Sequence, residues 1–363
     1  MTSTPVVATR ERGMRAWPVI RELRQSVGLQ RTMLVTGLVL VALFVVLAVF
    51  APLIAPYSFN ALSGPDGDFG SRQAPSLAHP FGTTIAGYDV LSRVIWGSRT
   101  ALLTIVIAVL SSIFVGTALG LISGYLGGAL DRVLVMIADA IYAFPSLLLA
   151  IVMSIMISGG QSSLWGGIWS AALSITVVFI PQYFRVVRSE VLRVKSEAFV
   201  ESARVIGASH RRIMVQHVFR NSTRSLPLVF TLNASEAILT LAGLGFLGFG
   251  IEPNSAAEWG YDLNKAVADV TNGIWWTSLW PGLAIVLIVM GLTLTGESLN
   301  DLSDPRLRVR RRAKAGTGAV ASTSVASAAA SGSAAAPEPV GSTNPTGFAD
   351  GQAEGNQAKG QGA

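Results

Sequence analysis

Long stretches of apolar residues, free or almost free of charge, alternate along this chain with polar segments. The apolar stretches are residues 32–54, 100–123, 133–157, 166–184, 225–251 and 274–296. A helix needs about 20 residues to cross a hydrocarbon core of about 30 Å, and each stretch reaches about that length. Buried helices of a large soluble protein are usually shorter and more often interrupted by charge. The pattern therefore predicts an all-α polytopic membrane protein with six transmembrane helices.

Basic residues indicate how these helices are oriented. If the N-terminus is cytoplasmic, the segments 1–31, 124–132, 185–224 and the C-terminal tail hold 23 of the 27 Lys and Arg residues. The remaining four, in the external segments, are Arg72, Arg93, Arg99 and Lys265. Cytoplasmic loops of membrane proteins carry an excess of basic residues. We therefore predict an N-in, C-in topology.

The two ends of the chain are predicted to lie outside the membrane domain, which we place at residues 32–310. Residues 1–31 form a basic cytoplasmic leader, in which Arg21, Arg24 and Arg31 are close enough to the first span to meet anionic lipid. Residues 311–363 are mostly Ala, Gly, Ser and Pro. Such a composition cannot bury enough apolar surface to fold, so we predict a disordered cytoplasmic tail.

Composition excludes several kinds of chemistry. Hydrophobic residues make up 51% of the chain and charged residues only 13%, cysteine is absent, and the three histidines are scattered at positions 79, 210 and 217. We therefore expect no metal site. We also expect no catalytic residues, no bound cofactor and no nucleic-acid partner. No G-x-x-x-x-G-K-[ST] segment occurs, so ATP binding by a P-loop is excluded. Residues 243–248 fit G-x-G-x-x-G, but they lie in an apolar helix without a preceding strand.

A short two-faced helix is predicted at residues 196–209, between the fourth and fifth spans. On a 3.6-residue pitch, Phe199, Ala203 and Ile206 share one stripe, and Glu197, Glu201 and Arg204 share another. Gly207 can adopt the positive φ that ends the helix and turns the chain. A second helix is predicted over residues 210–221. A two-faced helix held outside a membrane bundle is suited to contact another protein.

Within the spans, small residues and one acid are notable. Gly116, Gly120 and Gly124 form a ridge that lets another helix approach closely. Pro145 and Pro181 are expected to kink the third and fourth spans. These features suit packing within a helical bundle, and flexing during transport is the alternative interpretation.

Glu236 lies near the middle of the fifth span, where a lone acid costs a few kcal/mol unless it is paired or faces water. It is a candidate pathway residue, or else an interhelical hydrogen-bonding group.

Four segments, in order, resemble the permease subunits of ATP-binding-cassette importers of the dipeptide, oligopeptide and nickel group, C-type subunit. The segments are residues 79–93, 183–221, 243–260 and 300–308. The second contains Glu201-Ser202-Ala203 followed by Gly207, similar to the "EAA" loop of that family. Departures from the family pattern are Thr84 for an acid, Tyr88 for an arginine, Ser202 for an alanine and Arg220 for a proline.

The resemblance implies a type I ABC importer permease fold, located in the cell membrane as a multi-pass protein. It implies a heterodimer with a paralogous permease, two ATPase domains that bind ATP and Mg²⁺, and an extracytoplasmic solute-binding protein. Residues 185–224, which we call the coupling loop, would dock on the ATPase. The residues expected to couple ATPase motion to transport are Glu197, Glu201, Ser202, Ala203, Arg204 and Gly207.

The chain would then form half of a translocation pathway for peptides and would not itself be an enzyme. Nickel or another small solute is an alternative substrate. An ion-coupled secondary transporter that uses Glu236 is an alternative of another class, and six spans without an obvious inverted repeat argue against it. A membrane scaffold that recruits partners through the coupling loop and the tail is a third possibility.

Overall fold

Helices of the computed structural model run through most of the chain, and the structure describes residues 29–65, 67–158 and 164–303. These residues belong to one unit, Met1–Leu307, and the second unit, Arg308–Ala363, lies outside the described residues. The helices are α2 (Leu29–Val49), α3 (Ala51–Ile54), α4 (Val90–Leu126), α5 (Gly128–Tyr142), α6 (Ser146–Ser158), α7 (Leu164–Lys195), α8 (Ala198–Val205), α9 (His210–Arg212), α10 (Arg220–Ser222), α11 (Leu226–Phe246), α12 (Trp259–Thr271) and α13 (Trp276–Ser303). A π-helix, η1 (Ile213–Phe219), lies between α9 and α10. The predicted leader, residues 1–31, lies outside the described residues as far as residue 28, and the predicted tail, residues 311–363, lies wholly outside them.

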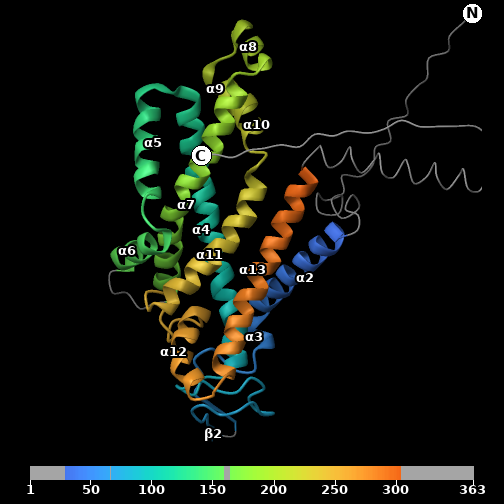
Figure 1. Ribbon diagram of the computed structural model, residues 1–363, viewed down its shortest axis with the longest axis vertical. Coiled ribbons are helices and arrows are strands. Elements are labelled where there is room, and N and C mark those ends of the chain that lie inside the picture. Colours follow the sequence, from blue (N-terminus) through green and yellow to red (C-terminus); the bar gives the residue numbers. More distant parts are fainter. Residues whose placement is uncertain (1–28, 66, 159–163, 304–363) are drawn as a thin grey trace, which may run out of the picture. The chain divides into compact units, whose positions relative to one another are not determined.

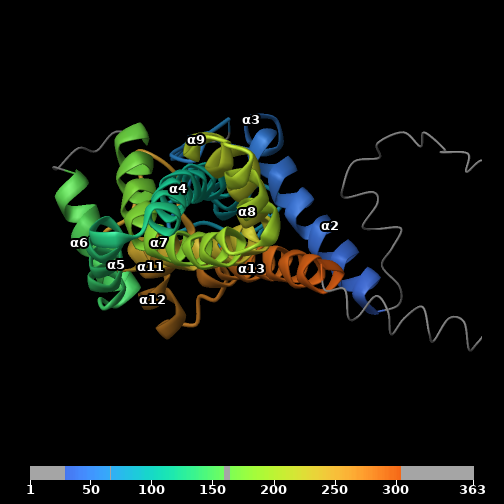
Figure 2. The ribbon, with the colours of Figure 1, turned by 90° about the horizontal axis from the view of Figure 1, so that it is seen from above.

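Among the described residues, five helices are long and apolar enough to cross a membrane: Gln30–Val49, Val90–Leu126, Gly166–Lys195, Leu226–Phe246 and Trp276–Asn300. They run side by side, with α8 beyond one end and the strands β1 (Ser63–Gly64) and β2 (Gly67–Asp68) at the other (Figure 1). The two strands pair antiparallel, Ser63 with Asp68 and Gly64 with Gly67. Seen along the helices, α4, α7 and α11 lie between α6 on one side and α2 on the other (Figure 2). An all-α polytopic membrane protein is the result.

The third predicted span, residues 133–157, is not one continuous helix. It is divided into α5 and α6, which are bent by 97° relative to each other. Pro145 lies in the break; it has no N–H to donate, and its ring disfavours helical backbone at the residue before it. A sixth span exists only if this bent pair is counted as one.

Other boundaries differ from the sequence prediction, since two helices continue into polar residues beyond the apolar stretches and one helix ends sooner. Helix α4 begins at Val90, ten residues before the predicted start, because Asp89 caps it by accepting a hydrogen bond from the Ser92 amide at 2.8 Å. Helix α7 continues past residue 184 to Lys195. Helix α11 ends at Phe246, before the predicted 251, and Gly248 turns the chain with a φ of +83°.

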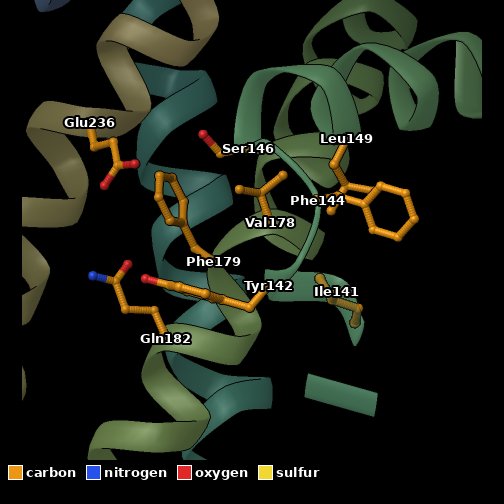
Figure 3. Close-up of a pocket in the computed structure, with 9 residues that line it drawn as sticks. All are labelled: Ile141, Tyr142, Phe144, Ser146, Leu149, Val178, Phe179, Gln182 and Glu236. Atoms are coloured by element: carbon orange, nitrogen blue, oxygen red, sulfur yellow. The ribbon is translucent and has the colours of Figure 1, made fainter. Parts of the chain in front are cut away.

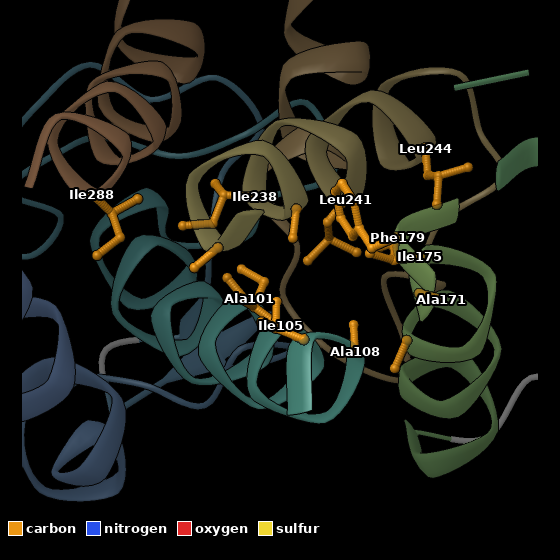
Figure 4. Close-up of a cluster of buried hydrophobic side chains, with 14 of the residues drawn as sticks. Ala101, Ile105, Ala108, Ala171, Ile175, Phe179, Ile238, Leu241, Leu244 and Ile288 are labelled. Carbon is orange, nitrogen blue, oxygen red and sulfur yellow. The ribbon is translucent and has the colours of Figure 1, made fainter. Parts of the chain in front are cut away.

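The core lies where α4, α7, α11 and α13 meet (Figure 4). Its side chains include Ala101, Ile105 and Ala108 from α4, Ala171, Ile175 and Phe179 from α7, Ile238, Leu241 and Leu244 from α11, and Ile288 from α13. Small residues on α4 and α7 let these two helices pack closely along much of their length. Helix α7 therefore runs from this core directly into the coupling loop.

Candidate functional site: the coupling loop, the Glu236 pocket and the opposite end

Helix α8 is attached to the bundle through one side. Val200 and Ala203 are buried against residues of α4, α7 and η1. We call this group the α8 cluster; its buried members are Tyr125, Val187, Val191, Val194, Val200, Ala203, Ile213 and Val218. Because Val187, Val191 and Val194 lie on α7, α8 rests directly on a helix that reaches the core.

The other side of α8 is free. Val205 and Ile206 are 81% and 83% exposed, and Glu201, Ser202 and Arg204 are also exposed. Within the described part of the chain, neither Glu201 nor Arg204 forms an ion pair. Of the predicted stripe of Phe199, Ala203 and Ile206, only Ala203 is buried. Phe199 is 43% exposed, and Ile206 lies in the turn beyond Val205, where the helix ends.

The turn after α8 has the geometry of a Schellman motif. Gly207 has a φ of +80°, its amide donates to the Arg204 carbonyl at 2.9 Å, and the Ala208 amide donates to the Ala203 carbonyl at 3.0 Å. Ser209 then accepts a hydrogen bond from the Arg212 amide at 3.4 Å and caps α9. These bonds fix the angle at which the chain leaves α8.

The predicted second helix, residues 210–221, is present but irregular. Its middle, Ile213–Phe219, is a π-helix, a form often found at functional positions. Ile213 and Val218 point into the α8 cluster, and His210 Nδ1 lies 3.1 Å from the hydroxyl of Tyr125. Lys195 also donates to the Tyr125 carbonyl at 2.6 Å. Arg220 is exposed at the start of α10, and nothing in its surroundings explains its presence where the family has proline.

The three glycines Gly116, Gly120 and Gly124 all face α7. A Cβ atom at Gly116 would lie 2.6 Å from Tyr183 Cβ, and one at Gly120 would lie 2.7 Å from the Phe184 carbonyl oxygen. At Gly124 it would lie 2.8 Å from Val191 Cγ1, a member of the α8 cluster. This close approach joins α4 and α7 from the core to the end that carries α8.

Glu236 lines a cavity of about 250 Å³ at the break between α5 and α6 (Figure 3). The lining residues are Ile141, Tyr142, Phe144, Ser146, Leu149, Val178, Phe179, Gln182 and Glu236. The polar ends of Glu236, Gln182, Tyr142 and Ser146 point to the same side of this group, whereas the ring of Phe144 points away (Figure 3). We call this the Glu236 pocket.

The end opposite α8 is closed by ionic contacts that the sequence analysis missed. Arg93 Nε donates to both carboxylate oxygens of Asp262, at 2.7 and 2.9 Å, and Arg72 Nε donates to Asp269 at 2.6 Å. His79 Nδ1 lies 2.9 Å from Asp89, so residues 72–93 pair with each other and with α12.

Glu258 is the N-cap of α12 and is buried among these groups. Its carboxylate accepts hydrogen bonds from the amides of Gly260 at 2.8 Å and Tyr261 at 2.7 Å. A Cβ at Gly245 would collide with this carboxylate, so only glycine fits there. Burial raises the pKa of Glu258 to about 8, although the two backbone hydrogen bonds act in the opposite direction. Burial also raises the pKa of Asp262, and Arg93 partly offsets the effect.

In the described ranges, no three His, Cys, Asp or Glu side chains lie close enough to hold a metal ion. The structure presents an exposed surface on α8 and a polar pocket between helices.

Comparison with known proteins agrees with this description. Residues 116–309 match the family described as "Binding-protein-dependent transport system inner membrane component". Residues 29–75 match the N-terminal transmembrane domain of oligopeptide transport permease C.

Individual relatives cover most of the chain. It is 35% identical over 274 residues to the dipeptide transport system permease protein DppC of Alkalihalophilus pseudofirmus, which covers 76% of this chain and 86% of that protein. It is 36% identical over 276 residues to the glutathione transport system permease protein GsiD of Escherichia coli, covering 76% and 87%. It is 35% identical over 276 residues to the probable D,D-dipeptide transport system permease protein DdpC of Escherichia coli K12, covering 75% and 87%.

Proposed function

Because the chain belongs to the inner-membrane components of binding-protein-dependent transport systems, a family of multi-pass permeases, we propose that it forms half of a pathway for short peptides in an ATP-driven importer. The names of its relatives, which are permeases for dipeptides, D,D-dipeptides or glutathione, support a substrate of this class. Nickel or another small solute is the alternative for the same kind of complex.

The mechanism rests on the difference between the two sides of α8. One side is packed on α7 through Val200 and Ala203, and the other side exposes Val205 and Ile206 with Glu201 and Arg204 beside them. Exposed large apolar side chains flanked by charges are typical of a protein–protein contact. We infer that an ATPase subunit covers this surface, and that Glu201 and Arg204 orient the docking.

In this mechanism, ATP-driven closure of two ATPase domains moves α8, and α7 transmits the movement to the core. The Schellman turn at Gly207 keeps α8 at a fixed angle to η1, so that both elements move together. The domain boundaries of the sequence analysis, with a membrane domain over residues 32–310, are part of this proposal. So are the N-in, C-in orientation, the paralogous permease partner and the external solute-binding protein.

The test is a pair of substitutions at Gly207. Nothing lies within 4 Å of a Cβ there, so the only obstacle to a side chain is the φ of +80°. Asn tolerates this backbone region and β-branched Val does not, at a cost of about 1–2 kcal/mol. In proteoliposomes that hold the complete complex and its binding protein, we expect G207V to lower ATP-dependent peptide uptake by about tenfold, the equivalent of about 1.4 kcal/mol. G207N should retain most of the uptake.

Three results would contradict the proposal. If uptake and ATP hydrolysis by G207V are both normal, the coupling assignment fails. Uptake that continues without ATP and stops when the proton gradient is removed would favour the ion-coupled transporter. ATP hydrolysis that the loaded binding protein does not stimulate would favour the scaffold.

A further inference from the structure

Helix α11 has one exposed side, and Glu236 lies in the middle of it. Leu232, Glu236, Leu239 and Phe246 follow one another at helical spacing and are all exposed, whereas the residues between them are mostly buried. A purely apolar stripe of this kind would suit lipid. A carboxylate in its centre would cost a few kcal/mol in hydrocarbon, so this side of α11 must face water or another polar group.

Glu236 and its neighbours have no polar partners within the residues that the structure describes. The side chains of Glu236, Gln182 and Ser146 accept or donate no hydrogen bond there, and the Tyr142 hydroxyl does not either. Gln182 is half-buried, and Glu236, Tyr142 and Ser146 are exposed in this chain. The Glu236 pocket therefore holds a set of polar groups that are directed at a space and not at one another (Figure 3).

The charges around the pocket favour a cation. Glu236 is its one ionisable acid, and no Lys or Arg lines it. Arg185, which stacks over the Tyr142 ring at 4.3 Å, is already paired with Asp139 at 2.7 Å. An ammonium group has three N–H donors and no acceptor. A carboxylate, an amide oxygen and a hydroxyl match those donors, and the ring of Phe179 can add a cation–π contact.

We propose that the Glu236 pocket transiently binds the protonated amino terminus of the transported peptide. This inference rests on the proposed function and adds a specificity site within the permease itself. The apolar part of the pocket, formed by Leu149, Val178 and Phe179, would receive the first side chain. Recognition would be loose, since one charged contact and apolar walls do not read a particular side chain.

The absence of native cysteine in this chain makes a direct test possible. In the variant Ser146→Cys, the only thiol of the chain lies in the pocket, and its reaction with a maleimide reports access to that space. Labelling of this chain in the complete complex is measured alone, with alanyl-alanine, with N-acetyl-alanyl-alanine, and with sodium chloride at equal ionic strength. Leu77→Cys, at a fully exposed position, is the labelling control.

We expect alanyl-alanine to slow labelling of Cys at position 146 and the other two additions to have little effect. When Glu236→Gln is added, about tenfold more peptide should be needed for the same protection, because a charge-assisted hydrogen bond is lost. Glu236→Asp should restore much of it. Leu239→Gln, a polar change on the same stripe one turn away, should leave protection unchanged.

The proposal is overturned if the acetylated peptide or the salt protects equally, or if protection persists in Glu236→Gln. It is also overturned if the thiol is unreactive without peptide, since a partner subunit would then fill the pocket. Peptide uptake by the unsubstituted complex distinguishes a failure of the proposed pocket from a failure of the proposed function. Complexes that import peptides but show no Glu236-dependent protection refute the pocket alone, and complexes that import no peptide refute the proposed substrate and the pocket together.

Discussion

The two ends of the bundle are held together in different ways. At the end that carries α12, the ion pair of Arg93 and Asp262 is buried, with side chains only 1% and 10% exposed. Between α5 and α7, on the side toward α8, the pair of Arg185 and Asp139 is open to solvent, at 45% and 56%, and the pair of Arg188 and Asp131 is partly exposed, at 28% and 18%. Buried pairs cost several kcal/mol when one partner is lost, whereas exposed pairs contribute about 0–1 kcal/mol. The end that carries α12 is therefore held by a buried ion pair, whereas the ion pairs between α5 and α7 are partly or fully open to solvent.

Removing Arg93 or Arg185 should show this contrast most strongly. Arg93→Ala leaves the Asp262 carboxylate buried without its partner and should destabilise the fold by about 3–5 kcal/mol. Arg185→Ala should cost less than about 1 kcal/mol. Thermal unfolding of the purified complex measures both. If the two variants lose equal stability, the distinction between a buried and an exposed ion pair is wrong.

The sequence predicted best what depends on neighbouring residues. Apolar stretches located the spans, and the freedom of Gly207 to adopt positive φ correctly located the end of α8. The pair of Arg93 and Asp262 could not be found, because its members are 169 residues apart and only the folded bundle brings them together. The 97° bend at Pro145 was underestimated as a kink, since proline breaks a helix locally but packing sets the angle.

Prediction of the α8 surface from periodicity alone was only partly right. A pitch of 3.6 residues grouped Ile206 with Ala203, but Ile206 lies in the turn, where the helical period no longer applies. The pocket around Glu236 was beyond prediction for another reason. A pocket between α7, α11 and the α5–α6 break depends on how those helices pack.

Within the α8 end, the packed and the free side of the helix should also respond differently. Val200 is fully buried in the α8 cluster, so Val200→Ala should cost about 2 kcal/mol through the lost methyl groups and the cavity that they leave. Ile206→Ala should change stability by less than about 0.5 kcal/mol when no ATPase subunit is bound. Its effect should instead appear as weaker ATPase binding and slower uptake. An Ile206→Ala complex with normal ATPase binding would show that the docking surface lies elsewhere.

At the closed end, the buried Glu258 should make stability depend on pH in a definite direction. Its pKa is near 8 in the folded state, through burial, and near 4.5 when the chain is unfolded. Between these values the folded carboxyl holds a proton that the unfolded one has lost, so stability falls as pH rises and levels off above about pH 8. Each pH unit in this window costs at most about 1.4 kcal/mol, and the nearby charges of Asp262 and Arg93 shift the upper limit of the window.

Glu258→Gln should flatten the dependence of the unfolding temperature on pH between pH 6 and pH 8. Glu252→Gln, at an exposed position in the same segment, should preserve that dependence. A slope that survives Glu258→Gln would move the titrating group to Asp262, and a slope of opposite sign would mean that Glu258 is ionised in the folded protein.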